Sequence, residues 1–200
     1  MESKFNFKNF SIVIPIFNEE EILEESTNAI FSLCKRMEID FEIIFSENGS
    51  TDKTKAIAEE LTNKHPEIKI ISNPEPNYGN ALKTGFKIAK NDLVISFDID
   101  YYSESFLREA LMLDSKYSSI TASKRLGSSE DGRRFVRRLA TNFFVILLKI
   151  LFGTKLSDTH GMKAIKKTEI EKFLPQVLST QDIFDTELLI RIEKNGGKIK

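Results

Sequence analysis

Short apolar runs alternate with longer amphipathic segments along the first half of the sequence, and this alternation strongly limits the possible folds. Four runs rich in β-branched residues have the length and composition of buried strands: 10–16, 41–45, 68–71 and 93–97. The intervening segments carry apolar side chains at helical spacing: 19–38, 52–64 and 79–90. Strands joined through helices predict right-handed crossovers, and therefore a mostly parallel, Rossmann-like α/β sheet with helices on both faces.

The pattern continues in shorter elements after residue 100. We expect a helix near 104–116, a strand near 118–123 and an amphipathic helix near 182–195. Residues 196–200 are typical of a turn followed by the first residues of another strand, which predicts that the sequence stops inside a longer protein.

Composition favours a soluble globular protein. The 200 residues contain 29 Lys and Arg against 30 Asp and Glu, a formal charge of −1, which argues against a general nucleic-acid binder. The only cysteine, Cys34, has no partner for an internal disulfide, so a reducing compartment fits best. We find no secretory signal in residues 1–10 and no run of the roughly 18 apolar residues that a spanning helix needs.

Common nucleotide and zinc motifs are absent from the sequence. No GxGxxG follows the first strand and no GxxxxGK[ST] occurs, which argues against a dinucleotide oxidoreductase or a P-loop NTPase. The only two histidines, His65 and His160, lie far apart, which excludes an HExxH zinc site.

Polar clusters follow three of the predicted strands, at 15–20, 46–52 and 98–100. Ligands of open parallel sheets bind beyond the carboxyl ends of the strands. Asp98 and Asp100 leave a buried strand there, and two carboxylates in this position predict a site for Mg²⁺ or Mn²⁺ that holds a diphosphate. Each cluster also has a plainer interpretation: surface or capping acids, or turns with helix caps.

Six sequence segments in a fixed order resemble glycosyltransferase family 2, with its inverting GT-A fold. They are IPIFNEE (14–20), SENGSTDKT (46–54), NYGNALKTGF (77–86), FDID (97–100), SDTHGMKAI (157–165) and FDTELL (184–189). Within the family the chain is most similar to the dolichyl-phosphate mannose synthase and dolichyl-phosphate glucosyltransferase branch. The resemblance covers nearly the whole chain and implies a single GT-A catalytic domain over residues 1–200. It also implies transfer of a hexose from a nucleotide-diphosphate sugar, of the GDP-mannose or UDP-glucose type, to a polyprenyl (dolichyl) phosphate.

The resemblance assigns roles by position. Asp98 and Asp100 would hold the metal and the diphosphate, and Asn48 would face the base. The remaining donor-binding positions are Pro15, Phe17 and Glu19, which would line the nucleoside, with Glu47, Gly49, Ser50, Asn77 and Gly79. The family usually has Asp-Asp-Gly-Ser where this chain has residues 47–50. An amide carbonyl at position 48 still accepts a hydrogen bond but lacks charge assistance, which leaves the choice between uracil and guanine open.

The acceptor is expected to meet a basic loop at 124–138 and an apolar segment at about 139–152. The resemblance assigns Arg125, with Arg133 or Arg134, to the acceptor phosphate, whereas a basic run can also be a solvated helix face. As a helix, the run 143–152 is about 15 Å long, half the thickness of a hydrocarbon core, so it suits the interface of a membrane. A core helix or a dimer contact is the alternative. The first interpretation predicts a peripheral protein on the cytoplasmic face of a membrane.

The acceptor decides whether a catalytic base is needed. A phosphate monoester is already largely ionised at neutral pH, whereas a hydroxyl acceptor requires a general base. Transfer to a hydroxyl in polysaccharide or glycolipid synthesis is therefore the alternative function, with Asp158, which matches a family acid near the active site, or Asp182 as the base. A nucleotide-sugar-binding protein without turnover is a third hypothesis, suggested by Asn48. The sequence leaves the sugar and the oligomeric state open.

Overall fold

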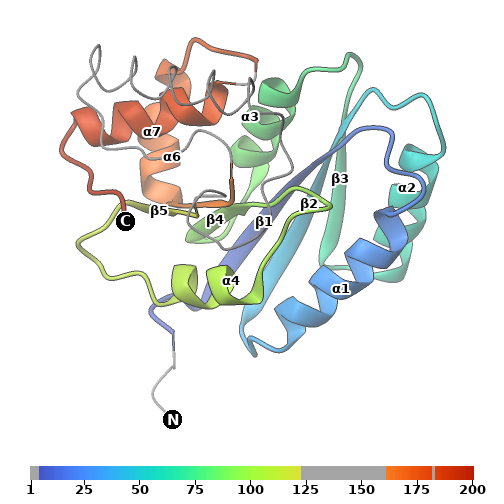
Figure 1. Cartoon of the computed structure of the whole chain (residues 1–200), viewed down its shortest axis with the longest axis horizontal. Coiled ribbons are helices and arrows are strands. Elements are labelled where there is room, and N and C mark those ends of the chain that lie inside the picture. The colour runs from blue at the N-terminus through green and yellow to red at the C-terminus, as the bar shows by residue number, and fades with distance from the viewer. Residues whose placement is uncertain (1–4, 123–160, 182) are drawn as a thin grey trace, which may run out of the picture.

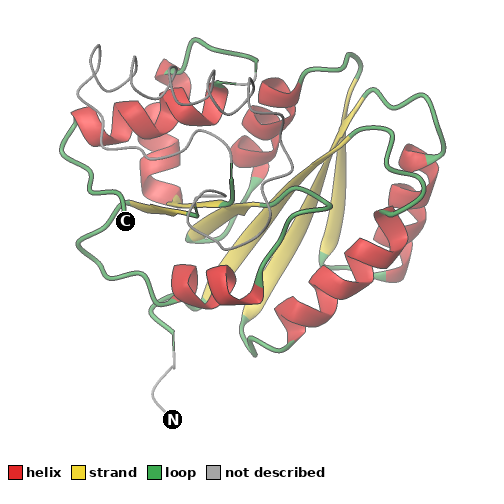
Figure 2. Ribbon diagram, viewed as in Figure 1, coloured by secondary structure: helices red, strands yellow, loops and turns green. Residues whose placement is uncertain are grey.

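The computed structural model describes residues 5–122, 161–181 and 183–200, whose strands form one sheet in the order β3-β2-β1-β4-β6-β5 (Figures 1 and 2). The strands are β1 (Asn9–Ile16), β2 (Asp40–Asn48), β3 (Ile68–Asn73), β4 (Leu93–Ser96), β5 (Ser119–Thr121) and β6 (Lys163–Lys166). The helices are α1 (Leu23–Lys35), α2 (Thr54–Lys64), α3 (Tyr78–Ile88), α4 (Glu104–Leu111), α6 (Lys167–Phe173), the short 3-10 helix η1 (Leu174–Gln176) and α7 (Phe184–Lys194).

The four strands β3, β2, β1 and β4 are parallel, and β1 lies between β2 and β4. β6 runs antiparallel to both β4 and β5, an arrangement common at the edge of large α/β sheets. The chain adds β2 and β3 on one side of β1 and then crosses to add β4 on the other side. The junction of β1 and β4 is therefore the point where the strand order reverses, and ligands of open α/β sheets bind at such a point.

The parallel strands are buried on both faces. In β1, Ile12 and Ile14 belong to a core cluster with α1, α2 and α4, whereas Val13 belongs to a second cluster with α3, α6 and α7. In β2, Ile43 faces the first cluster and Ile44 the second. Side chains of successive strand residues point to opposite faces, so an apolar run serves both cores at once. The expected sheet with helices on both faces is confirmed (Figure 2).

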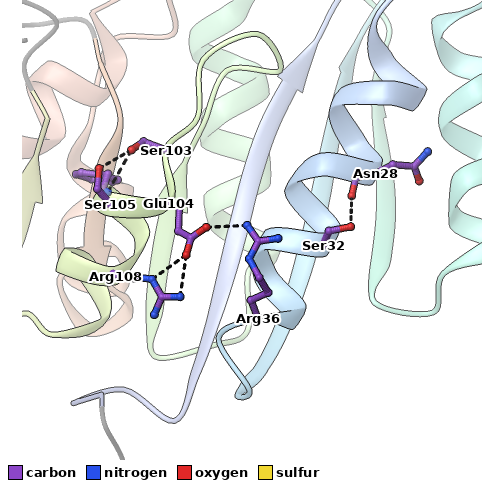
Figure 3. Close-up of polar contacts among 8 residues, drawn as sticks. Asn28, Ser32, Arg36, Ser103, Glu104, Ser105 and Arg108 are labelled. Carbon is purple, nitrogen blue, oxygen red and sulfur yellow. Dashed lines mark hydrogen bonds and ion pairs between the residues drawn. The ribbon is translucent and has the colours of Figure 1, made fainter. Parts of the chain in front are cut away.

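A polar contact joins α1 to α4 on the first face of the sheet. The Arg36 guanidinium lies 2.7 Å from Glu104 Oε2, and Arg108 donates to Glu104 Oε1 one turn further along α4 (Figure 3). Because both side chains of this ion pair are substantially exposed to solvent, it contributes little to stability. The apolar core beneath both helices therefore supplies most of the energy that holds them on the sheet.

The structure confirms the strands and helices expected up to residue 122, with ends that differ by a few residues, and the helix expected near 182–195. Residues 196–200 also pair as expected, because Ile199 bridges Ser119 in parallel. β6 and α6 were not predicted. The predictions for the basic loop and the apolar segment concern residues outside the described ranges. Among the residues that are described, no helix has both the length and the apolar character needed to cross a bilayer.

Close approach of α3 to the sheet depends on Gly85. A Cβ atom at this position would lie 2.3 Å from Val13 Cγ1 in the central strand. Valine has restricted side-chain rotamers and Val13 is fully buried, so it has little freedom to move away. The absence of a side chain at Gly85 therefore sets the distance between α3 and β1.

We expect Gly85→Ala to destabilise the chain by about 1–2 kcal/mol. Overpacking of this kind costs about 1–3 kcal/mol, and the better helix propensity of alanine offsets up to about 1 kcal/mol. Denaturant unfolding followed by circular dichroism measures the change. The control is Lys87→Ala on the same helix, where the exposed side chain should change stability by less than about 0.5 kcal/mol. Equal unfolding midpoints for the two variants would contradict the packing argument.

Candidate functional site

The sheet opens between β1 and β4 at its carboxyl edge. Pairing of β1 with β2 continues to Ile16 and Glu47, but its pairing with β4 ends at Val13 and Ser96. One further bond, from Phe97 N–H to the Val13 carbonyl at 3.1 Å, closes the ladder. Beyond it the two chains separate, and the polar residues after each strand border the opening. The structure thus brings the clusters at 15–20 and 98–100 to the reversal point of the sheet.

Acidic side chains gather at this opening. After β4, Ile99 is buried in the core, while Asp98 is half-buried and Asp100 exposed. Burial raises the pKa of Glu19, and the negative charges of Asp100, Asp52 and Asp98 raise it further. A carboxyl group whose pKa is raised by three neighbouring carboxylates lies in a region of negative potential. Such a region attracts cations.

The residues present fit a divalent cation that is shared with a phosphorylated ligand. Asp98 and Asp100 offer the hard oxygen ligands that Mg²⁺ and Mn²⁺ prefer. Within the described ranges, no group of three or more His, Cys, Asp or Glu side chains has the geometry of a closed metal site. One or two carboxylates, completed by water and substrate phosphates, are the usual protein contribution to a Mg²⁺ site.

Tyr78 also contacts the acidic cluster. Its hydroxyl donates to Asp98 Oδ1 at 3.0 Å, from the first residue of α3. The side chain is 37% exposed, so part of the ring remains open to a ligand. Tyr78 lies in the segment 77–86 of the family resemblance, but the sequence alone gives it no role. Its contact with Asp98 depends on how α3 packs, which no local pattern reveals.

Hydrogen bonds between backbone N–H groups and side-chain oxygens join the loop after β1 to the segment after β2. Asn18, which has a positive φ of 55°, donates its N–H to Ser50 Oγ at 3.1 Å and accepts from Thr51 N–H at 2.8 Å. Glu19 N–H donates to Thr54 Oγ1 at 2.7 Å. Phe17 lies beside these hydrogen bonds, and 39% of its surface is exposed. Pro15 is half-buried in β1. Of the predicted nucleoside positions, Phe17 and Glu19 therefore lie on one braced loop, and Pro15 lies in the strand that leads into it.

Glu47 and Asn48 are buried and bonded to the protein itself. Glu47 Oε1 accepts from Ser50 N–H at 2.6 Å and so closes the turn at Gly49, which has a φ of 75°. Asn48 Oδ1 accepts from Asn77 N–H at 2.7 Å. The carbonyl oxygen that the resemblance assigns to the base thus already holds the loop before α3. An amide oxygen has a second lone pair, so the two roles are compatible.

The start of α3 is held by buried amides and by a close backbone contact. Asn77 caps the helix by accepting from Asn80 N–H at 3.0 Å. Asn73, at the end of β3, donates to the Glu47 carbonyl at 3.1 Å and accepts from Thr84 Oγ1 at 3.2 Å. A Cβ atom on Gly79 would lie 2.0 Å from the Gln181 carbonyl oxygen. Gly79 therefore allows residues 180–181 to pack against α3.

A buried ion pair lies at the same edge of the sheet. Lys163 Nζ is 2.6 Å from Asp185 Oδ2, and both side chains are almost completely buried. Lys163 is the first residue of β6 and is paired with Ser96, two positions before Asp98, and Asp185 lies in the first turn of α7. Neither residue was given a role from the sequence, although both lie in segments that carry the family resemblance, 157–165 and 184–189.

The structure brings all of the predicted donor residues to one edge of the sheet. These are Pro15, Phe17, Glu19, Glu47, Asn48, Gly49, Ser50, Asn77, Gly79, Asp98 and Asp100. The predicted acceptor residues lie outside the described ranges: Arg125, Arg133, Arg134, Asp158 and Asp182. Asn18, Asp52, Tyr78 and Asp185 were not predicted as site residues.

An acidic, cation-compatible opening at the reversal point of a parallel α/β sheet is typical of proteins that bind phosphorylated ligands at this edge. The comparison with known families agrees with this class and narrows it. The sequence profile of glycosyl transferase family 2 matches residues 11–174, and the chain belongs to this family.

Two relatives illustrate the match. Glycosyltransferase AglD from Haloferax volcanii is 26% identical over 196 residues, which cover 94% of this chain and 31% of that protein. An undecaprenyl-phosphate 4-deoxy-4-formamido-L-arabinose transferase from Pseudomonas fluorescens is 34% identical over 171 residues, which cover 82% of this chain and 49% of that protein. The chain thus spans about half the length of these relatives or less.

Two solved structures share the fold. A mannosyltransferase from Pyrobaculum calidifontis, in complex with GDP-Man and Mn²⁺, superimposes with a TM-score of 0.64 at 17% identity, covering 98% of this chain and 55% of that one. Glucosyl-3-phosphoglycerate synthase from Mycobacterium tuberculosis, in complex with Mn²⁺, UDP and phosphoglyceric acid, gives 0.70 at 21% identity, covering 96% and 67%. The expected GT-A fold is confirmed.

We expect Glu19→Gln to stabilise the ligand-free chain near pH 7 by about 0.5 kcal/mol, typical of one partly exposed charge interaction. The folded state raises the pKa of Glu19, so the protonated side chain favours folding. This contribution to the free energy of unfolding is complete below the ordinary pKa of 4.5 and is lost as pH rises through the raised pKa. Glutamine keeps the shape but does not ionise.

Thermal unfolding across pH 3.5–8, a range of roughly one unit below the ordinary pKa to physiological pH, measures this difference. The gain in stability from Glu19→Gln should vanish at about pH 3.5, the acid end of this range. The exposed Glu21→Gln serves as the control and should show no gain. A gain that is the same at all pH values would rule out repulsion among the carboxylates as its cause.

Proposed function

We propose that this chain forms the catalytic domain of a metal-dependent glycosyltransferase. It moves a hexose from a nucleotide-diphosphate sugar to a polyprenyl phosphate, with inversion, at the cytoplasmic face of a membrane. The single observation that carries this proposal is the acidic opening between β1 and β4, where Asp98 and Asp100 lie beside Glu19. Concentrated negative charge is unfavourable for binding a diphosphate unless a cation accompanies it.

The donor half of the site follows from the loops around this opening. Phe17 is exposed on the braced loop after β1, where its ring offers a surface for the nucleoside. Asn48 and the turn at Gly49 contact the base. Asp98 and Asp100 would hold Mg²⁺ or Mn²⁺ with the diphosphate. A cation bound there would supply positive charge that stabilises the leaving diphosphate. Tyr78 keeps Asp98 oriented through its hydroxyl.

The assignment of the acceptor rests on the chemistry of phosphate groups and on the names of the relatives. An ionised phosphate oxygen attacks the anomeric carbon without a general base, so this site needs orientation and charge rather than proton transfer. Relatives named as undecaprenyl-phosphate sugar transferases support a polyprenyl phosphate as the acceptor. In our proposal Arg125, with Arg133 or Arg134, binds the acceptor phosphate, and Asp158 lies near the reacting groups.

A direct assay tests the reaction. Labelled GDP-mannose and UDP-glucose are each incubated with polyprenyl phosphate and Mn²⁺ or Mg²⁺, and the label that moves into organic solvent is measured. Metal-dependent transfer supports the proposal and identifies the donor. Nucleotide binding with transfer only to a hydroxyl acceptor, through Asp158 or Asp182 as the base, would favour the alternative enzyme. Binding without any transfer would favour a non-catalytic binding protein.

We expect Asp100→Asn to reduce transfer at least 100-fold. The Asp100 carboxylate would hold the cation that neutralises the leaving diphosphate, and losing one group that stabilises developing negative charge costs about 2.7–4 kcal/mol in the transition state. Initial rates at saturating metal measure this effect. The matched control is Asp92→Asn, an exposed aspartate at the opposite end of the same strand, which should leave the rate unchanged. Wild-type turnover by Asp100→Asn would refute the metal assignment.

Asn48→Asp restores the acid that is usual at this position in the family. We expect it to tighten binding of the nucleotide whose base donates an N–H there by about tenfold, since a charged acceptor forms a stronger hydrogen bond. Calorimetric titration with UDP and with GDP measures the change. Asn80→Asp adds the same charge nearby without facing the base, and it should not tighten binding. Equal effects of both variants would mean that position 48 does not contact the base.

A further inference from the structure

Large apolar side chains face solvent between η1 and α7. Leu178 is 83% exposed, and Ile183, just before α7, is 47% exposed. Tyr78 is a third exposed apolar side chain, at the start of α3, and α3 packs beside α7 (Figure 1). The close contact of Gly79 with the Gln181 backbone brings the start of α3 to this segment. We call Tyr78, Leu178 and Ile183 the apolar rim.

Hydrogen bonds hold the backbone around Leu178 in place. Glu187 of α7 accepts from the N–H groups of Leu178 and Ser179 at 3.1 and 2.8 Å, and Lys83 of α3 donates to the Val177 carbonyl at 3.3 Å. Burial works to raise the pKa of Glu187, but these N–H groups and Arg191 hold it below its ordinary value. The chain is therefore fastened on both sides of Leu178. Its exposure is part of the folded structure.

A lysine-lined pocket adjoins the apolar rim. It has a volume of about 350 Å³ and lies between α3, α6 and η1. Its lining consists of Lys83, Lys87, Lys167, Ile170, Glu171, Leu174 and Pro175. Lys83 connects the two features, because its ammonium group bonds to the residue before Leu178. Three lysines and a single glutamate give the pocket a positive charge above an apolar floor.

We propose that the apolar rim and the lysine-lined pocket together form a docking surface for an anionic phospholipid bilayer. Peripheral proteins bind bilayers by burying apolar side chains at the headgroup boundary while lysines contact lipid phosphates. Leu178 and Ile183 provide the first kind of contact, and the pocket provides the second. This inference rests on the proposed function, because a lipid-linked acceptor must reach the carboxyl edge of the sheet from a membrane.

The sequence contains no tryptophan, so one introduced tryptophan reports its own surroundings. Leu178→Trp is mixed with vesicles of phosphatidylcholine, with or without phosphatidylglycerol. We expect a blue shift and quenching by brominated acyl chains only with the anionic vesicles. Met112→Trp is the matched control: Met112 is half exposed at the end of α4, and its fluorescence should not change. An unchanged Leu178→Trp spectrum, or equal changes in both variants, would overturn the proposal.

A lysine substitution tests whether the lysine-lined pocket contributes to membrane binding. Lys87→Gln should weaken binding to anionic vesicles about fivefold, the contribution of one lysine near a charged surface, and high salt should reduce this difference. Lys55→Gln, exposed on α2 across the sheet, should bind like the wild type. Equal affinities of the two variants would show that the pocket does not contact lipid.

Transfer measured in detergent separates this proposal from the proposed function. Leu178→Trp lies outside the donor machinery and should turn over at the wild-type rate where no bilayer is present. Insertion of position 178 without any transfer to polyprenyl phosphate would contradict the acceptor assignment but support the docking surface. Transfer without insertion would support the acceptor assignment and overturn the docking surface.

Discussion

The hydrogen bonds of the central strand determine where chemistry is possible in this protein. β1 pairs with β2 along its whole length but with β4 only as far as Val13. An unpaired backbone is tolerated where it meets water or a ligand, and it is costly where it is buried. The early end of the β1–β4 ladder therefore creates an opening at the surface, and the donor-site residues lie in or next to the elements that reach this edge of the sheet.

The same edge brings together two kinds of polar group with opposite energetic effects. Buried amides and hydroxyls, such as Asn73 and Asn48, are bonded to the protein and brace the loops. The carboxylates of Glu19, Asp98 and Asp100 repel one another. Such repulsion lowers the stability of the ligand-free fold, and a cation bound there restores it. A rigid polar frame around a destabilised acidic centre is typical of a functional site.

The sequence predicts the elements whose residues are buried on both faces. The runs 10–16 and 93–97 are apolar except for one serine each, Ser11 and Ser96, because both of their faces meet a core. β6 escaped prediction because only Ala164 and Ile165 of its four residues are apolar, and its first residue, Lys163, is buried through an ion pair. The Asp98 and Asp100 pair could be found from its place after a strand. The contacts of Tyr78 and Glu187 could not, since each joins a helix to a loop segment whose position depends on tertiary packing.

The Lys163–Asp185 pair connects the donor edge to the surface around Leu178. Two buried charges are expensive to remove from water, so each holds the other firmly in position. Lys163 is anchored in β6 opposite Ser96, and Asp185 is anchored in α7 two residues before Glu187. Glu187 in turn bonds the backbone of Leu178 and Ser179. A displacement of α7 would therefore disturb both the strand that carries Asp98 and the segment that carries Leu178, which couples the geometry of the acidic opening to that of the apolar rim.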